Sequence, residues 1–207
     1  MTSIATILCF ALIAYLFWAD RRGSKDVSIA VWLPFLWMFF AASRFPVQWW
    51  DLGPPVPESF DVTDGSAMDR NVFLLLIVTA LWVLLRREIP WSTIAKNNFW
   101  ILSFFAFALL SVLWSDEPFV AFKRWIKGVG TLVMVLVVLT EKRPDEALGT
   151  ILRRLAFICL PLSILFIKYY PELGREYDQL GTPMYTGVAF QKNALGQLCM
   201  LVAIYFA

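Results

Sequence analysis

Long apolar runs follow one another along this 207-residue chain and constrain its fold more than any other feature. A helix needs about 20 predominantly apolar residues to cross the roughly 30 Å hydrocarbon core of a bilayer. Seven runs approach that length: approximately Ile4 to Ala19, Val27 to Ser43, Asn71 to Leu85, Phe99 to Trp114, Trp125 to Thr140, Leu155 to Tyr169 and Gly187 to Ala207. We therefore expect an all-α fold, a polytopic transmembrane helical bundle of about seven spans in contact with the lipid bilayer.

Composition agrees with a membrane protein and excludes several other classes. Hydrophobic residues make up 59% of the chain and charged residues only 16%, and the mean hydropathy is +0.66. The net charge of +2 is small, and no basic stretch is interleaved with aromatics on a polar background, so nucleic-acid binding is not expected. Because the sequence contains no histidine, it holds no Ser/His/Asp triad, Cys/His pair or histidine-ligated metal.

The cysteines and the acidic loop do not indicate a metal site. Cys9, Cys159 and Cys199 each lie in an apolar run at unrelated spacings, which favours small packing residues over a zinc site or a disulfide framework. The stretch "DVTDGSAMD" lacks the alternating acidic spacing of a calcium loop. We expect no metal and no cofactor.

The distribution of Lys and Arg predicts the topology, because cytoplasmic loops gather these residues. Alternate loops carry them: Arg21, Arg22 and Lys25, then Arg86, Arg87 and Lys96, then Lys142, Arg143, Arg153 and Arg154. The N-terminus is then outside, and residues 44–70 and 169–187 form outer loops. The first run lacks a basic residue before it and a cleavage site after it, so it is interpreted as a retained span. Because the last run stops at Ala207 without a polar flank, residues 1–207 are expected to be a single integral membrane domain, the N-terminal fragment of a longer protein.

One predicted outer loop carries an unexpected basic group. In "SDEPFVAFKRWIKG", Ser115 or Asp116 can cap a helix that has Pro118 in its first turn. Lys123, Arg124 and Lys127 then share one helical face. Either the span count is wrong by one, or these side chains anchor the helix at the interface by snorkelling, or they bind phosphate.

A second group of polar residues interrupts the last run, in "TPMYTGVAFQKNALGQ". Lys192 follows the presumed start of the span by about five residues, which places it roughly 7.5 Å below that start at helical rise. Asn193 lies one turn from Gln197, and Gly196 would let a neighbouring helix approach. The polar face is expected to meet protein or a cavity, where it either makes helix–helix hydrogen bonds or, in our preferred interpretation, binds an anion from the outer side.

Three stretches together resemble a known family. "SVLWSDEPFVAFKR", "YYPELGREY" and "YTGVAFQKNALGQ" are similar, in wording and order, to motifs of the O-antigen ligase and exopolysaccharide polymerase superfamily of bacterial inner-membrane glycosyltransferases, in its exopolysaccharide-production branch. The resemblance covers the chain from about the fourth expected span onward. Members are about twice as long as this chain, so it would correspond to the N-terminal half.

The resemblance implies a multi-pass enzyme of the bacterial inner membrane. It would act as a ligase or polymerase that transfers a glycan from an undecaprenyl-diphosphate carrier to a glycan or lipid acceptor on the periplasmic side, without nucleotide sugar or metal, beside other polysaccharide-assembly proteins. The two outer loops would be periplasmic. The family's essential histidine would lie in the missing half, so no catalytic residue is assigned here and the fragment alone should be inactive. Many members have histidine where this chain has Gln191, which argues against proton transfer at this position.

A diphosphate leaving group requires cations at the outer membrane edge, because its charge increases as the glycosidic bond breaks. The residues assigned to the diphosphate are Lys192 and Arg124, with Asn193 holding Lys192 or a phosphate oxygen, Arg175 at the loop rim, and Lys123 and Lys127 as further cations. Two other functions stay open: a flippase for lipid-linked glycans or another polytopic transporter, and a noncatalytic scaffold. Because Asp and Glu are confined to loops and span ends, a proton-driven carrier is disfavoured.

Overall fold

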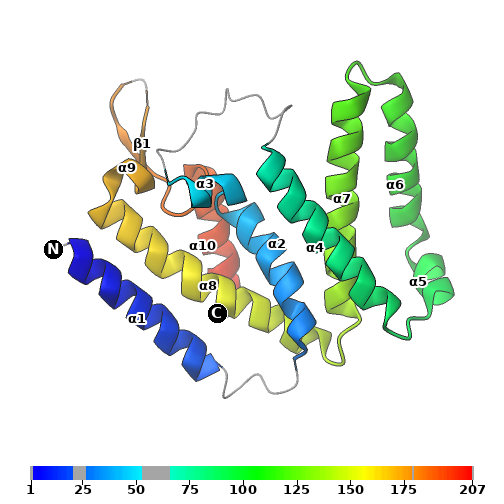
Figure 1. The fold of residues 1–207 in the computed structure, drawn as a ribbon, viewed down its shortest axis with the longest axis horizontal. Coiled ribbons are helices and arrows are strands. Elements are labelled where there is room, and N and C mark those ends of the chain that lie inside the picture. Colours follow the sequence, from blue (N-terminus) through cyan, green and yellow to red (C-terminus); the bar gives the residue numbers. More distant parts are fainter. Residues whose placement is uncertain (1, 21–26, 53–65, 179, 207) are drawn as a thin grey trace.

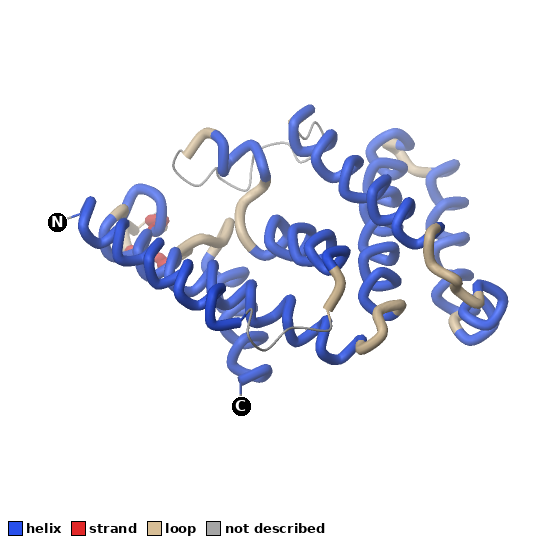
Figure 2. The backbone as a smooth tube through the Cα atoms, turned by 60° about the horizontal axis from the view of Figure 1, so that its bottom comes forward, coloured by secondary structure: helices blue, strands red, loops and turns tan. Residues whose placement is uncertain are grey.

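The computed structural model describes residues 2–20, 27–52, 66–178 and 180–206. Helices form almost all of this fold, and two short strands lie at one corner of it (Figure 2). The elements, in chain order, are α1 Thr2–Asp20, the 3-10 helix η1 Ile29–Val31, α2 Trp32–Ala42, α3 Pro46–Trp50, α4 Ala67–Leu85, α5 Trp91–Asn97, α6 Phe99–Ser111, the 3-10 helix η3 Val112–Trp114, α7 Pro118–Leu139, α8 Pro144–Tyr169, α9 Pro171–Gly174, β1 Arg175–Tyr177, β2 Pro183–Tyr185 and α10 Lys192–Phe206.

Three described helices are long and apolar enough to cross a membrane: α1, α4 and α8. A fourth span is reached if α5 and the helix that follows it count as one broken span, since they bend by 83° at their junction. The protein is thus an all-α, multi-pass membrane protein, and the expected number of seven spans is wrong.

Three of the predicted spans do not form complete membrane-crossing helices, each for a different reason. Residues 27–43 divide into η1 and an 11-residue α2, which covers only about 16 Å at helical rise. α7 has 22 residues, but Lys123, Arg124 and Lys127 lie in its N-terminal half. α10 begins only at Lys192 and has 15 residues, which is shorter than a complete span requires.

The core has two parts that share α2. α8 packs against α1, α2 and α10, and its completely buried Leu155 and Cys159 lie at the centre of the larger part. In the smaller part α7 packs against α4 and α2 around Ala80 and Val137. Gly130 of α7 makes this approach close, because a Cβ there would lie 2.5 Å from the Trp37 ring. Both parts fix how the helix ends are arranged.

The helices place the two classes of predicted loop at opposite ends of the bundle (Figure 1). One end, here named the outer end, holds α3, α9, the β1–β2 hairpin and the starts of α4, α7 and α10. The inner end holds α5, the end of α1 and the α7–α8 turn. Residues 53–65 of the first predicted outer loop lie outside the described residues, as do Arg21, Arg22 and Lys25 of the first predicted inner loop. Which end faces the cytoplasm stays a prediction.

Ion pairs stabilise the inner end. Arg87, just after α4, pairs with the nearly buried Glu141 after α7, and it also donates to the Thr140 hydroxyl (2.6 Å) and the Val137 carbonyl (2.8 Å). Ser28 donates to the same carboxylate at 2.6 Å, so one buried anion joins three elements. Substitution of Arg87 by a neutral residue would leave the buried Glu141 carboxylate without a compensating positive charge.

Candidate functional site

A buried turn precedes the polar segment Gln191-Lys192-Asn193. Thr186, Val188 and Ala189 are completely buried, although no regular helix or strand contains them. The Thr186 and Gly187 amides both donate to the Gly174 carbonyl at 3.0 Å, and the Val188 amide donates to the Ser163 hydroxyl of α8 at 3.1 Å. The "YTG" sequence is therefore a backbone clamp that holds the start of α10 against α8 and α9.

Two glycines are required for this clamp. Gly187 has a φ of 58°, in the left-handed region, and a Cβ there would lie 2.7 Å from the Ser163 side chain. A Cβ on Gly174 would lie 2.4 Å from the Phe166 carbonyl carbon. Larger residues would separate the turn from α8, so the motif fixes where Lys192 emerges.

Lys192 is the first residue of α10 and is exposed, with its ammonium 3.0 Å from the Met184 sulfur. The expected position about 7.5 Å inside a span is therefore wrong, because the buried turn delays the helix by five residues. Asn193 is also exposed, and the space around Gly196 is open rather than filled by another helix of the described chain. The polar strip does not meet protein within the described residues.

The position of Lys192 is electrostatically unfavourable for the helix. The N-terminus of a helix carries a partial positive charge, and a cation there costs about 0.3 to 1 kcal/mol. An anion at the same place would be attracted both by the ammonium and by the free amides of the first turn. Lys192 thus slightly destabilises the start of α10, and the same position would attract a negatively charged ligand.

The hairpin brings Arg175 to the same corner. Arg175 pairs with Tyr185 across the two strands, and its guanidinium lies 5.7 Å from the centre of the Tyr185 ring. Its Nε donates to the Ile167 carbonyl at 2.8 Å, which fixes the side chain beside α8. Met184 and Tyr185 are consecutive in β2, so this strand contacts both cations, Lys192 and Arg175, on its two opposite faces.

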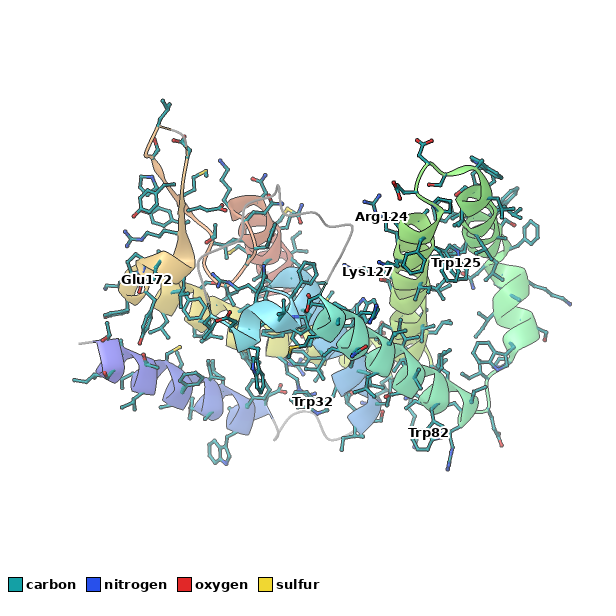
Figure 3. The ribbon with its side chains drawn as sticks, turned by 45° about the horizontal axis from the view of Figure 1, so that its top comes forward. Trp32, Trp82, Arg124, Trp125, Lys127 and Glu172 are labelled. Atoms are coloured by element: carbon teal, nitrogen blue, oxygen red, sulfur yellow. The ribbon has the colours of Figure 1, made fainter. Side chains whose placement is uncertain are left out.

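The predicted helix with Pro118 in its first turn is confirmed as α7, although Glu117 rather than Ser115 or Asp116 is the N-cap residue. Figure 3 shows Arg124 and Lys127 on one side of α7 and Trp125 on the side facing α6. The Lys127 ammonium lies 4.9 Å from the centre of the Phe45 ring, and Lys123 lies over Phe119. Arg124 is exposed.

The six predicted site residues therefore form two groups at the outer end. Arg175, Lys192 and Asn193 belong to the hairpin and α10, whereas Lys123, Arg124 and Lys127 belong to α7. α2 packs against both α10 and α7 and separates the groups. The structure thus gathers the residues at one end without bringing all of them into contact.

Ion pairing differs sharply between the two ends. Within the described residues, the recorded ion pairs involve Arg87, Arg143, Arg153 and Arg154, all at the inner end. Among the same residues, Arg124, Lys127, Arg175 and Lys192 form no ion pair with a carboxylate. Asp69 attracts Lys127 electrostatically without pairing with it. Four outer cations are consequently not neutralised by the described part of the chain.

Sequence reasoning missed Arg44, which it treated only as the edge of an outer loop. Arg44 is 2% exposed, donates to the Leu173 carbonyl and lies 5.9 Å from the centre of the Phe166 ring. Burial lowers the pKa of its guanidinium from the ordinary value, but an arginine stays charged at physiological pH. The sequence does contain a feature that could have indicated this buried cation: Arg44 lies directly between an apolar run and Phe45-Pro46.

Comparison with known proteins adds no relative. The chain matches no family model, no curated protein and no solved structure.

Proposed function

We propose that the outer end binds the diphosphate of a polyprenyl-linked glycan, and that the protein acts as a membrane glycosyltransferase, a ligase or polymerase in exopolysaccharide or O-antigen biosynthesis in the bacterial inner membrane. The observation that carries this proposal is the set of four outer cations, Arg124, Lys127, Arg175 and Lys192, that have no carboxylate partner among the described residues. A cation at the edge of a membrane is costly when no anionic group lies beside it. Such a cation therefore attracts an anion such as a phosphate.

The chemistry of such a donor fits the arrangement of charge and apolar surface. The polyprenyl chain stays in the bilayer along exposed apolar helices, and the diphosphate lies at the membrane edge. As the sugar leaves, negative charge accumulates on the diphosphate, and fixed cations lower the energy of that state. Lys192 and Arg124 are assigned to the phosphates, Asn193 to a phosphate oxygen, Arg175 to the rim, and Lys123 and Lys127 to the surrounding field.

The two cation groups favour two different contacts with one extended ligand. Lys192 would hold one phosphate at the start of α10, and Arg175, on the opposite face of β2, would lie at the rim. The α7 group, on the other side of α2, would contact the second phosphate or the first sugar. The resemblance in the "YTGVAFQKNALGQ" segment supports the same assignment.

Binding tests this proposal without requiring turnover. The chain is reconstituted in nanodiscs of neutral lipid and titrated with undecaprenyl diphosphate or with undecaprenol. Native mass spectrometry then measures the fraction of the chain that binds each lipid. We expect the diphosphate to bind at least about tenfold more tightly, since charge-assisted hydrogen bonds contribute about 1.5 to 3 kcal/mol each. Equal affinity for the two lipids would refute the assignment.

A flippase would bind the same lipid, so a second measurement separates the two functions. Transport of a fluorescent lipid-linked glycan across proteoliposomes without transfer to an acceptor would favour the flippase. Transfer of glycan by membranes of the native cells, lost when Lys192 is substituted in the chromosomal gene, would favour the ligase or polymerase.

A further inference from the structure

α5 is a short helix at the inner end, and it is bent sharply away from the helix that follows it. The two helices meet at 83°, with Asn98 between them. The Asn98 side-chain amide donates to the Ile94 carbonyl at 3.0 Å, which satisfies one of the carbonyl groups at the end of α5. A local hydrogen bond therefore stabilises the bend.

The apolar and polar residues of α5 lie on opposite sides of the helix, since successive residues are about 100° apart. The apolar side holds Trp91, Ile94 and Ala95, and the polar side holds Ser92, Thr93, Lys96 and Asn97. Trp91 is 46% exposed and Ala95 is also exposed. The described part of the chain thus leaves much of the apolar side uncovered, and this side requires an apolar partner.

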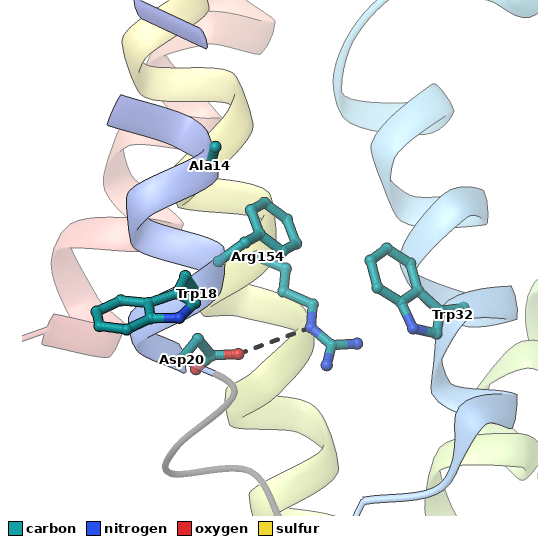
Figure 4. A pocket seen from close by; sticks show the side chains of 6 residues that line it. Ala14, Trp18, Asp20, Trp32 and Arg154 are labelled. Atoms are coloured by element: carbon teal, nitrogen blue, oxygen red, sulfur yellow. Dashed lines mark ion pairs between the residues drawn. The ribbon is translucent and has the colours of Figure 1, made fainter. Parts of the chain in front are cut away.

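Tryptophans gather at the same end of the bundle. One lies in the last turn of α4, one begins α5 and one lies in the first turn of α6, and they are 56%, 46% and 83% exposed: Trp82, Trp91 and Trp100. Trp18 of α1 and Trp32 of α2 line an inner-end pocket and are 53% and 37% exposed (Figure 4). Because indole rings concentrate at the level of lipid headgroups, these residues indicate a membrane surface at the inner end.

α6 does not need α5 to cross the hydrocarbon core. Its 13 residues and the three of η3 cover about 25 Å at helical rise, close to the roughly 30 Å of the core. No residue of α6, all of which the structure describes, is buried, and Phe104 and Phe107 are 65% and 63% exposed. If α6 crosses the bilayer, the 83° bend places α5 nearly parallel to the membrane surface.

The charges around α5 fit an anionic surface. Residues 82–100 contain three basic residues and a single acidic one, Glu88. Arg87 pairs with Glu141, whereas Arg86 and Lys96 are exposed. The Arg86 guanidinium carbon lies 4.6 Å from the centre of the Trp82 ring, so this cation lies beside an interfacial side chain. Basic side chains at this level are attracted to anionic headgroups.

We propose that α5 is an interfacial helix that lies in the headgroup layer at the inner end, with Trp91 and Ala95 toward the acyl chains and Arg86 and Lys96 among anionic phospholipid headgroups. Apolar contact and electrostatic attraction act together in such helices. The partner of this surface is the membrane itself. α5 would hold the α6–α7 hairpin at a fixed depth, and this role does not depend on the ligand of the outer end.

Spin labels on the two sides of α5 test its placement. Thr93→Cys and Ala95→Cys are each made in a chain with Cys9, Cys159 and Cys199 replaced by alanine, labelled with a nitroxide and placed in nanodiscs of equal phosphatidylglycerol and phosphatidylcholine. Both positions are exposed, so neither label disturbs the core. We expect the Ala95 label to collide mainly with oxygen, which concentrates in lipid, and the Thr93 label mainly with a water-soluble nickel chelate. Lipid-like accessibility at both positions would show a broken span, and water-like accessibility at both would show a helix in solution; either result overturns the proposal.

Lipid preference tests the headgroup contact. Native mass spectrometry of the chain released from the same nanodiscs measures retained phosphatidylglycerol against phosphatidylcholine. Lys96→Gln should lower this preference by about fivefold, the size expected for one basic residue near a membrane surface. Arg143→Gln is the matched control, because it removes an exposed inner-end arginine that pairs with Glu146 instead. An unchanged preference in Lys96→Gln, or an equal loss in both variants, would contradict the headgroup contact.

Discussion

At the scale of single residues, Lys192 differs from the inner-end cations in what surrounds it. Arg87 and Arg153 have carboxylates within ion-pair distance, whereas Lys192 contacts a methionine sulfur and the positive end of a helix. A residue that opposes the helix dipole contributes nothing to folding there. In the proposed function, Lys192 instead attracts the anionic ligand.

Substitution of Lys192 should separate binding from stability. Lys192→Ala should weaken undecaprenyl diphosphate binding by about tenfold to a hundredfold and leave thermal stability unchanged or slightly raised, because an exposed, unfavourable charge is removed. Lys192→Arg should keep part of the affinity, since a planar fork replaces a compact ammonium. Asn193→Ala should have a milder effect than Lys192→Ala.

These substitutions are measured as affinity per folded protein in the same nanodiscs. A Lys192→Ala chain with full affinity would contradict the assignment. A larger effect of Asn193→Ala than of Lys192→Ala would indicate that the strip joins helices rather than binding an anion.

The backbone clamp gives a second residue-scale prediction. Gly187→Ala should destabilise the fold by about 1 to 3 kcal/mol, because alanine is strained at positive φ and its Cβ would collide with Ser163. Gly196→Ala is the control: open space surrounds it inside α10, so alanine should stabilise the helix by up to about 1 kcal/mol. Thermal unfolding in detergent checks both, and equal melting temperatures would refute the clamp.

At the scale of elements, the Arg87–Glu141 pair connects the ends of α4 and α7. Glu141 has a side chain only 4% exposed, whereas the Arg143–Glu146 pair has both partners about half exposed. Arg87→Met should therefore cost about 3 to 5 kcal/mol, because a buried carboxylate is left without its cation. Arg143→Gln should change the free energy of unfolding by less than about 0.5 kcal/mol.

A double variant distinguishes pairing from general damage. Arg87→Met combined with Glu141→Leu removes both charges and should recover most of the loss, as replaced buried pairs often do. Denaturation of the three variants measures this coupling. A double variant as unstable as the sum of the single ones would show that the two side chains act independently.

Sequence patterns predicted elements better than they predicted depth. Pro118 correctly indicated the first turn of α7. The predicted outer and inner loops lie at opposite ends of the bundle in Figure 1, and their sidedness stays a prediction. Span lengths were wrong where apolar composition continued through irregular backbone, as at Val188 before α10. Hydropathy does not register a turn whose backbone groups are satisfied by Ser163 and Gly174. Long-range pairs such as Arg87 with Glu141 depend on packing and leave no local signal.

At the scale of the whole molecule, the outer and inner ends differ in electrostatic design. The inner end places carboxylates within ion-pair distance of Arg87, Arg143 and Arg153. The outer end keeps Arg124, Lys127, Arg175 and Lys192 without ion pairs in the described part of the chain. Such an asymmetry would serve a protein that meets a charged lipid-linked donor at one face only.

Sidedness decides whether those cations can meet a diphosphate at the outer face of the membrane. Thr182 is exposed at the outer end and Ser92 is exposed in α5 at the inner end. With Cys9, Cys159 and Cys199 replaced by alanine, Thr182→Cys should react with a membrane-impermeant maleimide in intact cells. Ser92→Cys should react only after the membrane is permeabilised. The reverse labelling would place Lys192 in the cytoplasm and contradict the proposed function.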